Sequence, residues 1–155
     1  NDSKQMSEDK REELFSKIDE RAIAVGTGIV ENDVIDDINI QQASFLAMKK
    51  AIHSLDFFPD YLLVDGNREI PEIDYRQKCV IDGDEKSNCI AAASIVAKVT
   101  RDKIIDQFDK TYPEYGFINN KGYGTSEHIK ALEEYGPSPI HRYSYTVVEK
   151  NSDVG

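Results

Sequence analysis

Apolar residues form three short runs in this chain, each bounded by residues that favour turns. The runs cover residues 22–30, 61–65 and 77–82. Short runs rich in valine, isoleucine and leucine between turn-forming residues are typical of β-strands. The pattern therefore predicts three strands, the second ending on Asp65 and the third on Asp82.

In four other stretches, 7–21, 40–55, 88–112 and 125–135, the pattern predicts helices. Ser7 is a suitable N-cap for the first of them, and the acids that follow it would lie at the positive end of the helix dipole. The predicted order is helix, strand, helix, two strands and two helices. Such an order indicates an α/β or α+β domain.

The length of 155 residues and the hydrophobic content of 39% suit one globular domain, which we place at residues 1–148 with a flexible tail at 149–155. Cys79 and Cys89 have neither the number nor the spacing of a disulfide framework or a metal site. No apolar run approaches the roughly 20 residues of a membrane span. We therefore expect a soluble, cytoplasmic monomer without a membrane partner.

The net charge of −10 argues at first against a nucleic acid partner, because phosphate binding normally needs a basic surface. Local charge differs from the total, however. The stretch from Lys86 to Arg101 also contains Lys98 and has no acid, and the stretch 115–126 has Lys121 as its only cation and Glu114 just before it. Binding of nucleic acid by a basic part of the surface is compatible with this distribution.

Asp65 and Asp84 follow the second and third predicted strands and are the candidate metal ligands. Carboxylates suit Mg²⁺ or Mn²⁺, which often take only one or two protein carboxylates and complete their shell with water and substrate phosphates. The residues alone leave a simpler interpretation open. Asp65 fits an Asp-Gly-Asn turn, and Asp84 fits a cap near the next helix.

A glycine-rich loop, Lys121-Gly122-Tyr123-Gly124-Thr125, presents a cation and an aromatic ring just before the last predicted helix. Lysine and exposed backbone N–H groups can bind phosphate, and tyrosine can stack or donate a hydrogen bond. Near the C-terminus, His141-Arg142 is either a surface pair or a phosphate contact. Each of these signals is weak when taken alone.

Several segments occur along the chain in the order in which a known family carries them. Together they resemble ribonuclease HII, and the long helix of alanines and serine that ends on Lys-Val-Thr-Arg-Asp is the most specific of them. The segments are Asn1-Asp2-Ser3-Lys4, Ile35-Asp36-Asp37-Ile38-Asn39-Ile40, Val64-Asp65-Gly66-Asn67-Arg68, Gly83-Asp84 with Lys86-Ser87, the stretch 90–102, Tyr115-Gly116-Phe117, Lys121-Gly122-Tyr123-Gly124-Thr125 and the stretch 136–142.

The resemblance implies a ribonuclease H-like α/β fold with a C-terminal helical segment. That family has four metal-binding acids, two of them in an N-terminal Asp-Glu-Ala-Gly-Arg-Gly motif that this chain lacks. We therefore expect an N-terminally truncated chain whose fold is incomplete because the first strands are missing. Asp65 and Asp84 correspond to the third and fourth acids, and so to catalytic and metal-binding residues.

The resemblance also implies a substrate-binding set. Tyr123 corresponds to the tyrosine that packs at the ribonucleotide sugar. Lys4, Lys121 and Arg142 correspond to contacts with the nucleic acid backbone, and Asn39 joins them as a substrate-binding residue. The chain departs from the family at Asp82, Asn120 and Tyr143, where lysine, histidine and arginine are common, and each departure removes positive charge or a donor from the substrate side.

The implied function is that of a metal-dependent endonuclease, with two Mg²⁺ or Mn²⁺ ions, that cuts the RNA strand of RNA–DNA hybrids and cleaves 5′ of ribonucleotides embedded in duplex DNA. Two alternatives stay open. In the first alternative, the chain is a non-catalytic fragment of such an enzyme, because two of the four acids are missing. A remote alternative interprets Asp82-Gly83-Asp84 as part of an unrelated magnesium-dependent phosphatase.

Overall fold

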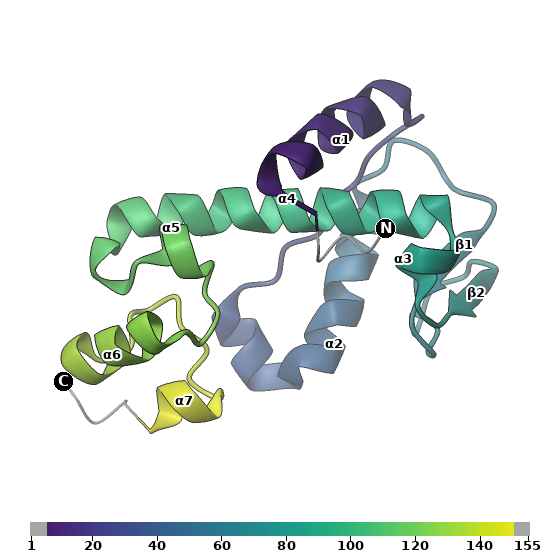
Figure 1. The fold of residues 1–155 in the computed structure, drawn as a ribbon. Helices are drawn as coiled ribbons and strands as arrows, with labels where there is room; N and C mark the ends of the chain where they lie inside the picture. The colour runs from purple at the N-terminus through teal and green to yellow at the C-terminus, as the bar shows by residue number, and fades with distance from the viewer. Residues whose placement is uncertain (1–5, 151–155) are drawn as a thin grey trace. The chain divides into compact units, whose positions relative to one another are not determined.

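The structure is a computed structural model that describes residues 6–150 (Figure 1). Lys4 and the end of the expected tail lie outside the described residues. The chain divides into two compact units, one made of the residues up to Ile29 with Ser44–Val99 and the other of Val30–Ala43 with the residues from Thr100 onward. No helix in the described part is long and apolar enough to cross a membrane. The elements are α1 (Glu8–Arg21), α2 (Asn32–His53), β1 (Leu62–Asp65), β2 (Gln77–Val80), α3 (Gly83–Lys86), α4 (Asn88–Thr111), η2 (Pro113–Tyr115), α5 (Phe117–Asn120), α6 (Ser126–Tyr135) and α7 (Thr146–Glu149).

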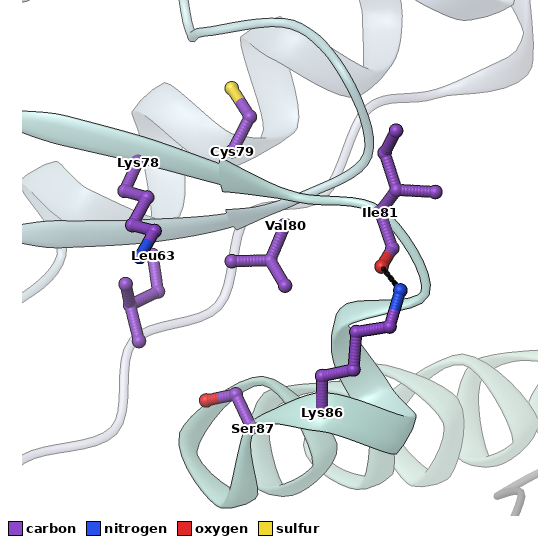
Figure 2. A pocket seen from close by; sticks show the side chains of 7 residues that line it. All are labelled: Leu63, Lys78, Cys79, Val80, Ile81, Lys86 and Ser87. Carbon is purple, nitrogen blue, oxygen red and sulfur yellow. Dashed lines mark hydrogen bonds between the residues drawn. The ribbon is translucent and has the colours of Figure 1, made fainter.

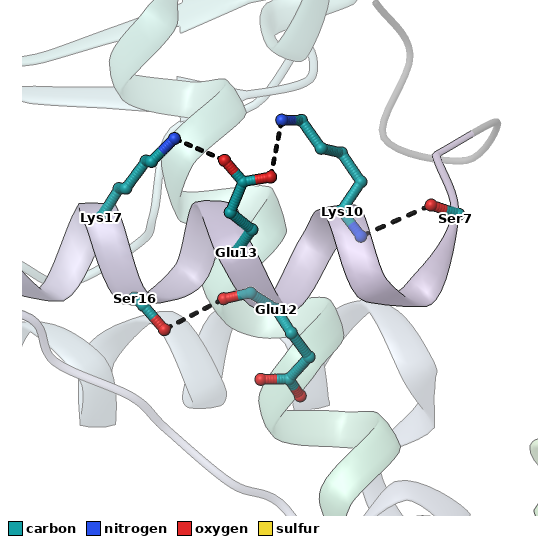
Figure 3. Close-up of polar contacts among 6 residues, drawn as sticks. All are labelled: Ser7, Lys10, Glu12, Glu13, Ser16 and Lys17. Atoms are coloured by element: carbon teal, nitrogen blue, oxygen red, sulfur yellow. Dashed lines mark hydrogen bonds and ion pairs between the residues drawn. The ribbon is translucent and has the colours of Figure 1, made fainter.

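Helix α1 confirms the predicted amphipathic helix and its cap. The Ser7 hydroxyl accepts a hydrogen bond from the Lys10 backbone N–H at 3.4 Å. On the exposed side, Lys10 and Lys17 both contact the Glu13 carboxylate, at 2.8 and 2.5 Å (Figure 3). Hydrogen bonds from the two ammonium groups lower the pKa of Glu13 to about 2. Local pairs of this kind support a helix that buries none of its own residues.

The strand predicted over residues 22–30 is wrong, because no described strand pairs with this segment. Its exposure still alternates as in a strand: odd-numbered residues are exposed, Ile23 by 94%, and even-numbered residues are partly buried. Gly26 and Gly28 lie against α2, where an added Cβ would come within 2.3 Å of the Ala51 carbonyl and 1.9 Å of the Ala47 carbonyl. The segment therefore has the side-chain period of a strand without the hydrogen-bond ladder that defines one.

Helix α2 begins at Asn32, eight residues before the predicted start at residue 40, and has a break at Asn39. Asn39 adopts φ 69° and ψ 163°, a backbone conformation that non-glycine residues rarely adopt. Its Oδ1 accepts hydrogen bonds from the backbone N–H groups of Gln41 and Gln42 at 3.0 and 3.1 Å. The Asn39 side chain thus caps the part of the helix that the sequence predicts.

Strands β1 and β2 confirm the predicted strands at 61–65 and 77–82 and form a parallel pair. Their register places Leu62 opposite Gln77 and Asp65 opposite Val80. The third predicted strand is shorter than expected because Asp82 adopts a left-handed conformation, with φ 53°, and starts the short helix α3. Since the strands are parallel, their carboxyl ends lie at one edge of the sheet.

In the second unit a small core forms from buried residues of η2, α5, α6 and α7. Tyr115 is central to this core, and its hydroxyl donates to the Gly136 carbonyl at 2.8 Å. Helix α6 confirms the helix predicted over 125–135, with Thr125 as its N-cap. Helix α4 confirms the long helix predicted over 88–112. The buried core residues are Tyr115, Phe117, Ala131, Leu132 and Val148.

Candidate functional site

The two aspartates proposed as metal ligands follow the carboxyl ends of the paired strands β1 and β2. Asp65 is the last residue of β1 and is exposed, while Asp84 lies in the first turn of α3 and is partly buried. The backbone N–H of Gly83 donates to Asp65 Oδ1 at 2.9 Å. The Asp65 carboxylate therefore lies against the residue that directly precedes Asp84.

Gly83 is buried, and the space around it is too small for a side chain. An added Cβ would lie 2.6 Å from Ile90 Cδ1 and 3.0 Å from Asp65 Oδ1. Both separations are shorter than ordinary van der Waals contact, so Ile90 or Asp65 would have to move. The absence of a side chain at this position allows the Asp65 carboxylate to reach the Gly83 N–H.

We expect Gly83→Ala to weaken Mn²⁺ binding about tenfold, since moving the partner that orients a metal ligand typically costs tenfold to a hundredfold in affinity. It should also lower the melting temperature, because Ile90 must repack. Isothermal titration and thermal melts measure the two effects. Gly124→Ala is the matched control, because a Cβ there would meet nothing within 4 Å. Unchanged Mn²⁺ affinity in Gly83→Ala would contradict this account of the site.

The carboxylate oxygens at this edge are suitable ligands for a hard divalent cation. Asp65 and Asp84 contribute carboxylates, and the hydrogen bond from Gly83 uses only part of the acceptor capacity of Asp65. Within residues 6–150 no group of three or more histidine, cysteine, aspartate or glutamate side chains is arranged to hold a metal. Two carboxylates nevertheless fit Mg²⁺ or Mn²⁺, which commonly complete their coordination with water and substrate phosphates.

A shallow pocket lies beside this edge of the sheet (Figure 2). Lys86 reaches back across it, and its ammonium donates to the Ile81 carbonyl at 2.7 Å and lies 3.6 Å from the Asp82 carboxylate. The Lys86 ammonium is therefore held near Asp82 by a backbone carbonyl rather than by a buried acid. The residues that line the pocket are Leu63, Lys78, Cys79, Val80, Ile81, Lys86 and Ser87.

The loop that carries Tyr123 belongs to the second unit and is fixed by several hydrogen bonds. Asn120 is buried; its Nδ2 donates to the Tyr115 carbonyl at 2.7 Å, and its Oδ1 accepts from the Gly122 N–H at 2.8 Å. The Tyr123 side chain is nevertheless 58% exposed. The Arg101 guanidinium lies over its ring, 5.2 Å from the centroid, and also donates to the Lys121 carbonyl at 3.0 Å. The loop thus holds an exposed aromatic ring next to a cation.

Two of the residues predicted to contact the nucleic acid backbone, Lys121 and Arg142, also belong to the second unit. The Lys121 ammonium pairs with the Asp106 carboxylate, and its side chain is only 17% exposed. The Arg142 guanidinium lies 5.0 Å from the centroid of the Tyr145 ring. Just after Arg142, the Tyr143 N–H donates to the Asp36 carboxylate at 2.7 Å. Burial raises the pKa of Asp36, but hydrogen bonds from Ser144 and Tyr143 outweigh it, and the pKa is lowered overall.

Comparisons with known proteins place these features in a family. The sequence profile of ribonuclease HII matches residues 1–148. The chain belongs to the ribonuclease HII family. It is 58% identical to ribonuclease HII of Clostridioides difficile over 94% of this chain, and 55% identical to ribonuclease HII of Bacillus velezensis over 96% of this chain.

A solved structure gives the same result for the fold. The crystal structure of ribonuclease H2 from Pyrococcus horikoshii matches with a TM-score of 0.78 and 26% identity, over 99% of this chain and 80% of that one. The mixed α/β fold expected from the resemblance is confirmed. The chain spans 56% and 57% of the lengths of the C. difficile and B. velezensis relatives.

The departures from the ribonuclease HII pattern have local structural roles here. Asp82 takes the left-handed position before α3, where a side chain is strained. Asn120 holds the Tyr123 loop through the two hydrogen bonds described above. The backbone of Tyr143 connects its segment to Asp36. The Asp82 carboxylate, 3.6 Å from the Lys86 ammonium, and the Asn120 amide therefore make side-chain contacts of their own, whereas the Tyr143 contact uses its backbone.

The residue pattern assigns no role to four residues that contact the candidate residues within their own units. Gly83 and Arg101 lie within the segments that carry the family resemblance, but only their contacts reveal that they orient Asp65 and Tyr123. Asp106 and His128 carry no sequence signal for their contacts with Lys121 and with the Tyr123 carbonyl. Contacts between residues distant in sequence decide these roles, so only the structure could supply them.

Proposed function

We propose that this chain provides the second pair of acids and the sugar-reading loop of an endonuclease that hydrolyses the RNA strand of RNA–DNA hybrids. We further propose that it cleaves 5′ of a ribonucleotide embedded in duplex DNA. The observation that carries the proposal is the Asp65 carboxylate, which the Gly83 N–H holds beside Asp84 in a chain of the ribonuclease HII family. The enzyme would act in the cytoplasm as a monomer.

Asp65 and Asp84 are the proposed ligands of the Mg²⁺ or Mn²⁺ ions. When bound, two such ions would activate a water molecule and stabilise the leaving 3′-oxygen during an in-line displacement. The protein's own contribution is orientation. Gly83 fixes one oxygen of Asp65 before any ligand arrives, so little reorganisation of the carboxylate is needed.

Tyr123 is the proposed contact with the sugar at the cleavage junction. The 2′-hydroxyl is the group that distinguishes a ribonucleotide from its DNA neighbours. The exposed Tyr123 side chain offers both a ring face and a hydroxyl, and its backbone is held while the ring stays accessible. Arg101 over the ring adds positive charge where a phosphate would approach.

We expect Lys121→Ala to make the salt dependence of hybrid binding shallower by about one in the log–log slope, because one phosphate contact would be lost. Fluorescence anisotropy at several salt concentrations measures the slope. Asp106→Asn is the matched control, since it removes the partner of the Lys121 ammonium but keeps the cation. If the slope is unchanged in Lys121→Ala and binding is weaker in both variants, then Lys121 stabilises the loop through its ion pair with Asp106 and does not contact phosphate.

The central experiment is a cleavage assay on a duplex with one embedded ribonucleotide. The protein should carry a relative's N-terminal segment ahead of Asn1, so that all four family acids are present. We expect Mn²⁺- or Mg²⁺-dependent cleavage that leaves a 3′-hydroxyl and a 5′-phosphate at the junction. Hydrolysis of a small phosphate ester without cleavage of hybrid or duplex would favour the phosphatase alternative instead.

A further inference from the structure

A buried pair of histidines lies under the Tyr123 loop. His128, from α6, and His141 are 4% and 7% exposed, and their Nε2 atoms are 3.0 Å apart. Aromatic rings surround the pair, with the Tyr115 centroid 4.8 Å from that of His141 and the Phe117 centroid 5.4 Å from that of His128. Histidine pairs buried this deeply need a defined arrangement of protons, because an unsatisfied nitrogen would be costly.

The neighbours of the pair determine which nitrogens carry protons. A carbonyl oxygen only accepts, so His128 Nδ1, 2.9 Å from the Tyr123 carbonyl, must carry a proton and donate it. A backbone N–H only donates, so His141 Nδ1, which receives the Ser138 N–H at 3.0 Å, must be bare, and the Ser138 hydroxyl, 2.8 Å away, can donate to the same atom. In neutral rings, His141 Nε2 then carries the proton and donates to the bare Nε2 of His128. One proton on each ring satisfies all four nitrogens.

The surroundings favour the neutral form of His141 that this arrangement needs. Burial, and repulsion between the two rings when both are protonated, lower the pKa of His141 to about 4. The Tyr115 phenol also packs on the pair; burial raises its pKa, so it is neutral at pH 7 as well. A second proton on either ring would set two N–H groups against each other across the 3.0 Å gap.

The proton arrangement extends to the loop through one atom. The Tyr123 carbonyl accepts from His128 Nδ1 at 2.9 Å and from the Thr125 N–H at 2.8 Å. Thr125 in turn caps α6 by accepting the His128 N–H at 3.3 Å. The backbone of Tyr123 is therefore fixed to α6, and through the histidine pair to the segment at Ser138.

We propose that His128 and His141 are positioning residues, a proton-ordered pair that fixes the Tyr123 carbonyl and thereby the angle at which the Tyr123 ring meets the substrate sugar. The inference rests on the proposed function for the role of Tyr123. Neither histidine contacts the substrate in this account. They act through the backbone of the loop, so their loss should change catalysis at the sugar rather than the affinity for the duplex.

Nitrogen NMR of the histidine rings in the 155-residue chain at pH 7 tests the pair without reference to catalysis. We expect the Nδ1–H tautomer for His128, the Nε2–H tautomer for His141, and a scalar coupling across the N–H···N hydrogen bond. His128→Asn preserves a side-chain N–H at the position of Nδ1 and should keep the Tyr123 amide signal in place, whereas His128→Phe should shift it. The opposite tautomers, or a charged ring, would overturn the proposal.

Kinetics of the protein carrying a relative's N-terminal segment test the consequence for catalysis. With a single embedded ribonucleotide, His128→Phe should lower kcat by about tenfold to a hundredfold, as expected for a misplaced reacting group, and leave KM within about twofold. His128→Asn should recover most of that loss. Equal loss in both variants, or a change in KM alone, would overturn the positioning role. If the expected tautomers are found but Tyr123→Ala affects hybrid and embedded ribonucleotide equally, the proposed function of Tyr123 fails while the histidine pair stands.

Discussion

Asp65→Asn is expected to lower the cleavage rate by about a thousandfold or more and to leave hybrid binding within about twofold. Losing a metal ligand removes several kcal/mol of transition-state stabilisation, and about 4 kcal/mol corresponds to a thousandfold. The amide keeps the shape of the carboxylate, and its carbonyl oxygen still accepts the Gly83 N–H, so the local fold should survive. Single-turnover cleavage and fluorescence anisotropy, in the protein carrying a relative's N-terminal segment, measure the two quantities.

The control for Asp65→Asn is Asp60→Asn, which removes the same charge from an exposed aspartate shortly before β1. It should change neither rate nor binding appreciably. Asp84→Asn should reproduce the loss of cleavage if, as proposed, the two carboxylates bind metal in one site. Equal losses of binding and cleavage in Asp65→Asn would instead indicate a structural role for Asp65, and the proposed metal site would have to be abandoned.

The sequence predicts the part of the site that depends on local chemistry. The runs that end at Asp65 and near Asp84 are strands, and their parallel pairing puts both carboxyl ends at one edge of the sheet. The period of the apolar residues also predicts α1, α4 and α6 to within about a residue. These elements are long or strongly patterned, and their caps lie next to them in the sequence.

Prediction from the sequence fails where the structure depends on partners that are distant along the chain. Residues 22–30 have the composition and alternation of a strand, but a strand also needs a neighbour, and no described strand lies beside them. Asn39 and Asp82 both adopt a positive φ, which non-glycine residues rarely do, and no local pattern marks either position. Helices of three or four residues, such as α3 and α5, are too short to show a period.

The contacts that orient the proposed site are also long-range. Gly83 meets Asp65 from 18 residues away, and His141 meets His128 from 13 residues away. Residue types alone suggested that Asp65 and Tyr123 were worth attention. The structure adds why their orientation is fixed, since a glycine backbone holds the one and a histidine pair holds the other.

Tyr123→Ala is expected to lower kcat/KM at a single embedded ribonucleotide about a hundredfold, and on a long RNA–DNA hybrid by about tenfold or less. At a single ribonucleotide only one 2′-hydroxyl is available to position the junction. Losing the contact with it should therefore lower the rate by about as much as a misplaced reacting group does, roughly a hundredfold. On a hybrid, neighbouring 2′-hydroxyls and backbone contacts share that positioning. Steady-state cleavage of both substrates at one salt concentration, in the protein carrying a relative's N-terminal segment, gives the ratio of the two losses.

Two further variants separate the causes. Tyr123→Phe keeps the ring under the Arg101 guanidinium and removes only the hydroxyl, so it divides the effect between stacking and hydrogen bonding. Tyr61→Ala removes a tyrosine of comparable exposure, 48% against 58%, and should leave the ratio unchanged. Equal losses on both substrates in Tyr123→Ala would restrict Tyr123 to packing within its loop. A selective loss that Tyr123→Phe reproduces would assign the recognition of the ribose to the phenolic hydroxyl, because the ring and its contact with Arg101 remain in that variant.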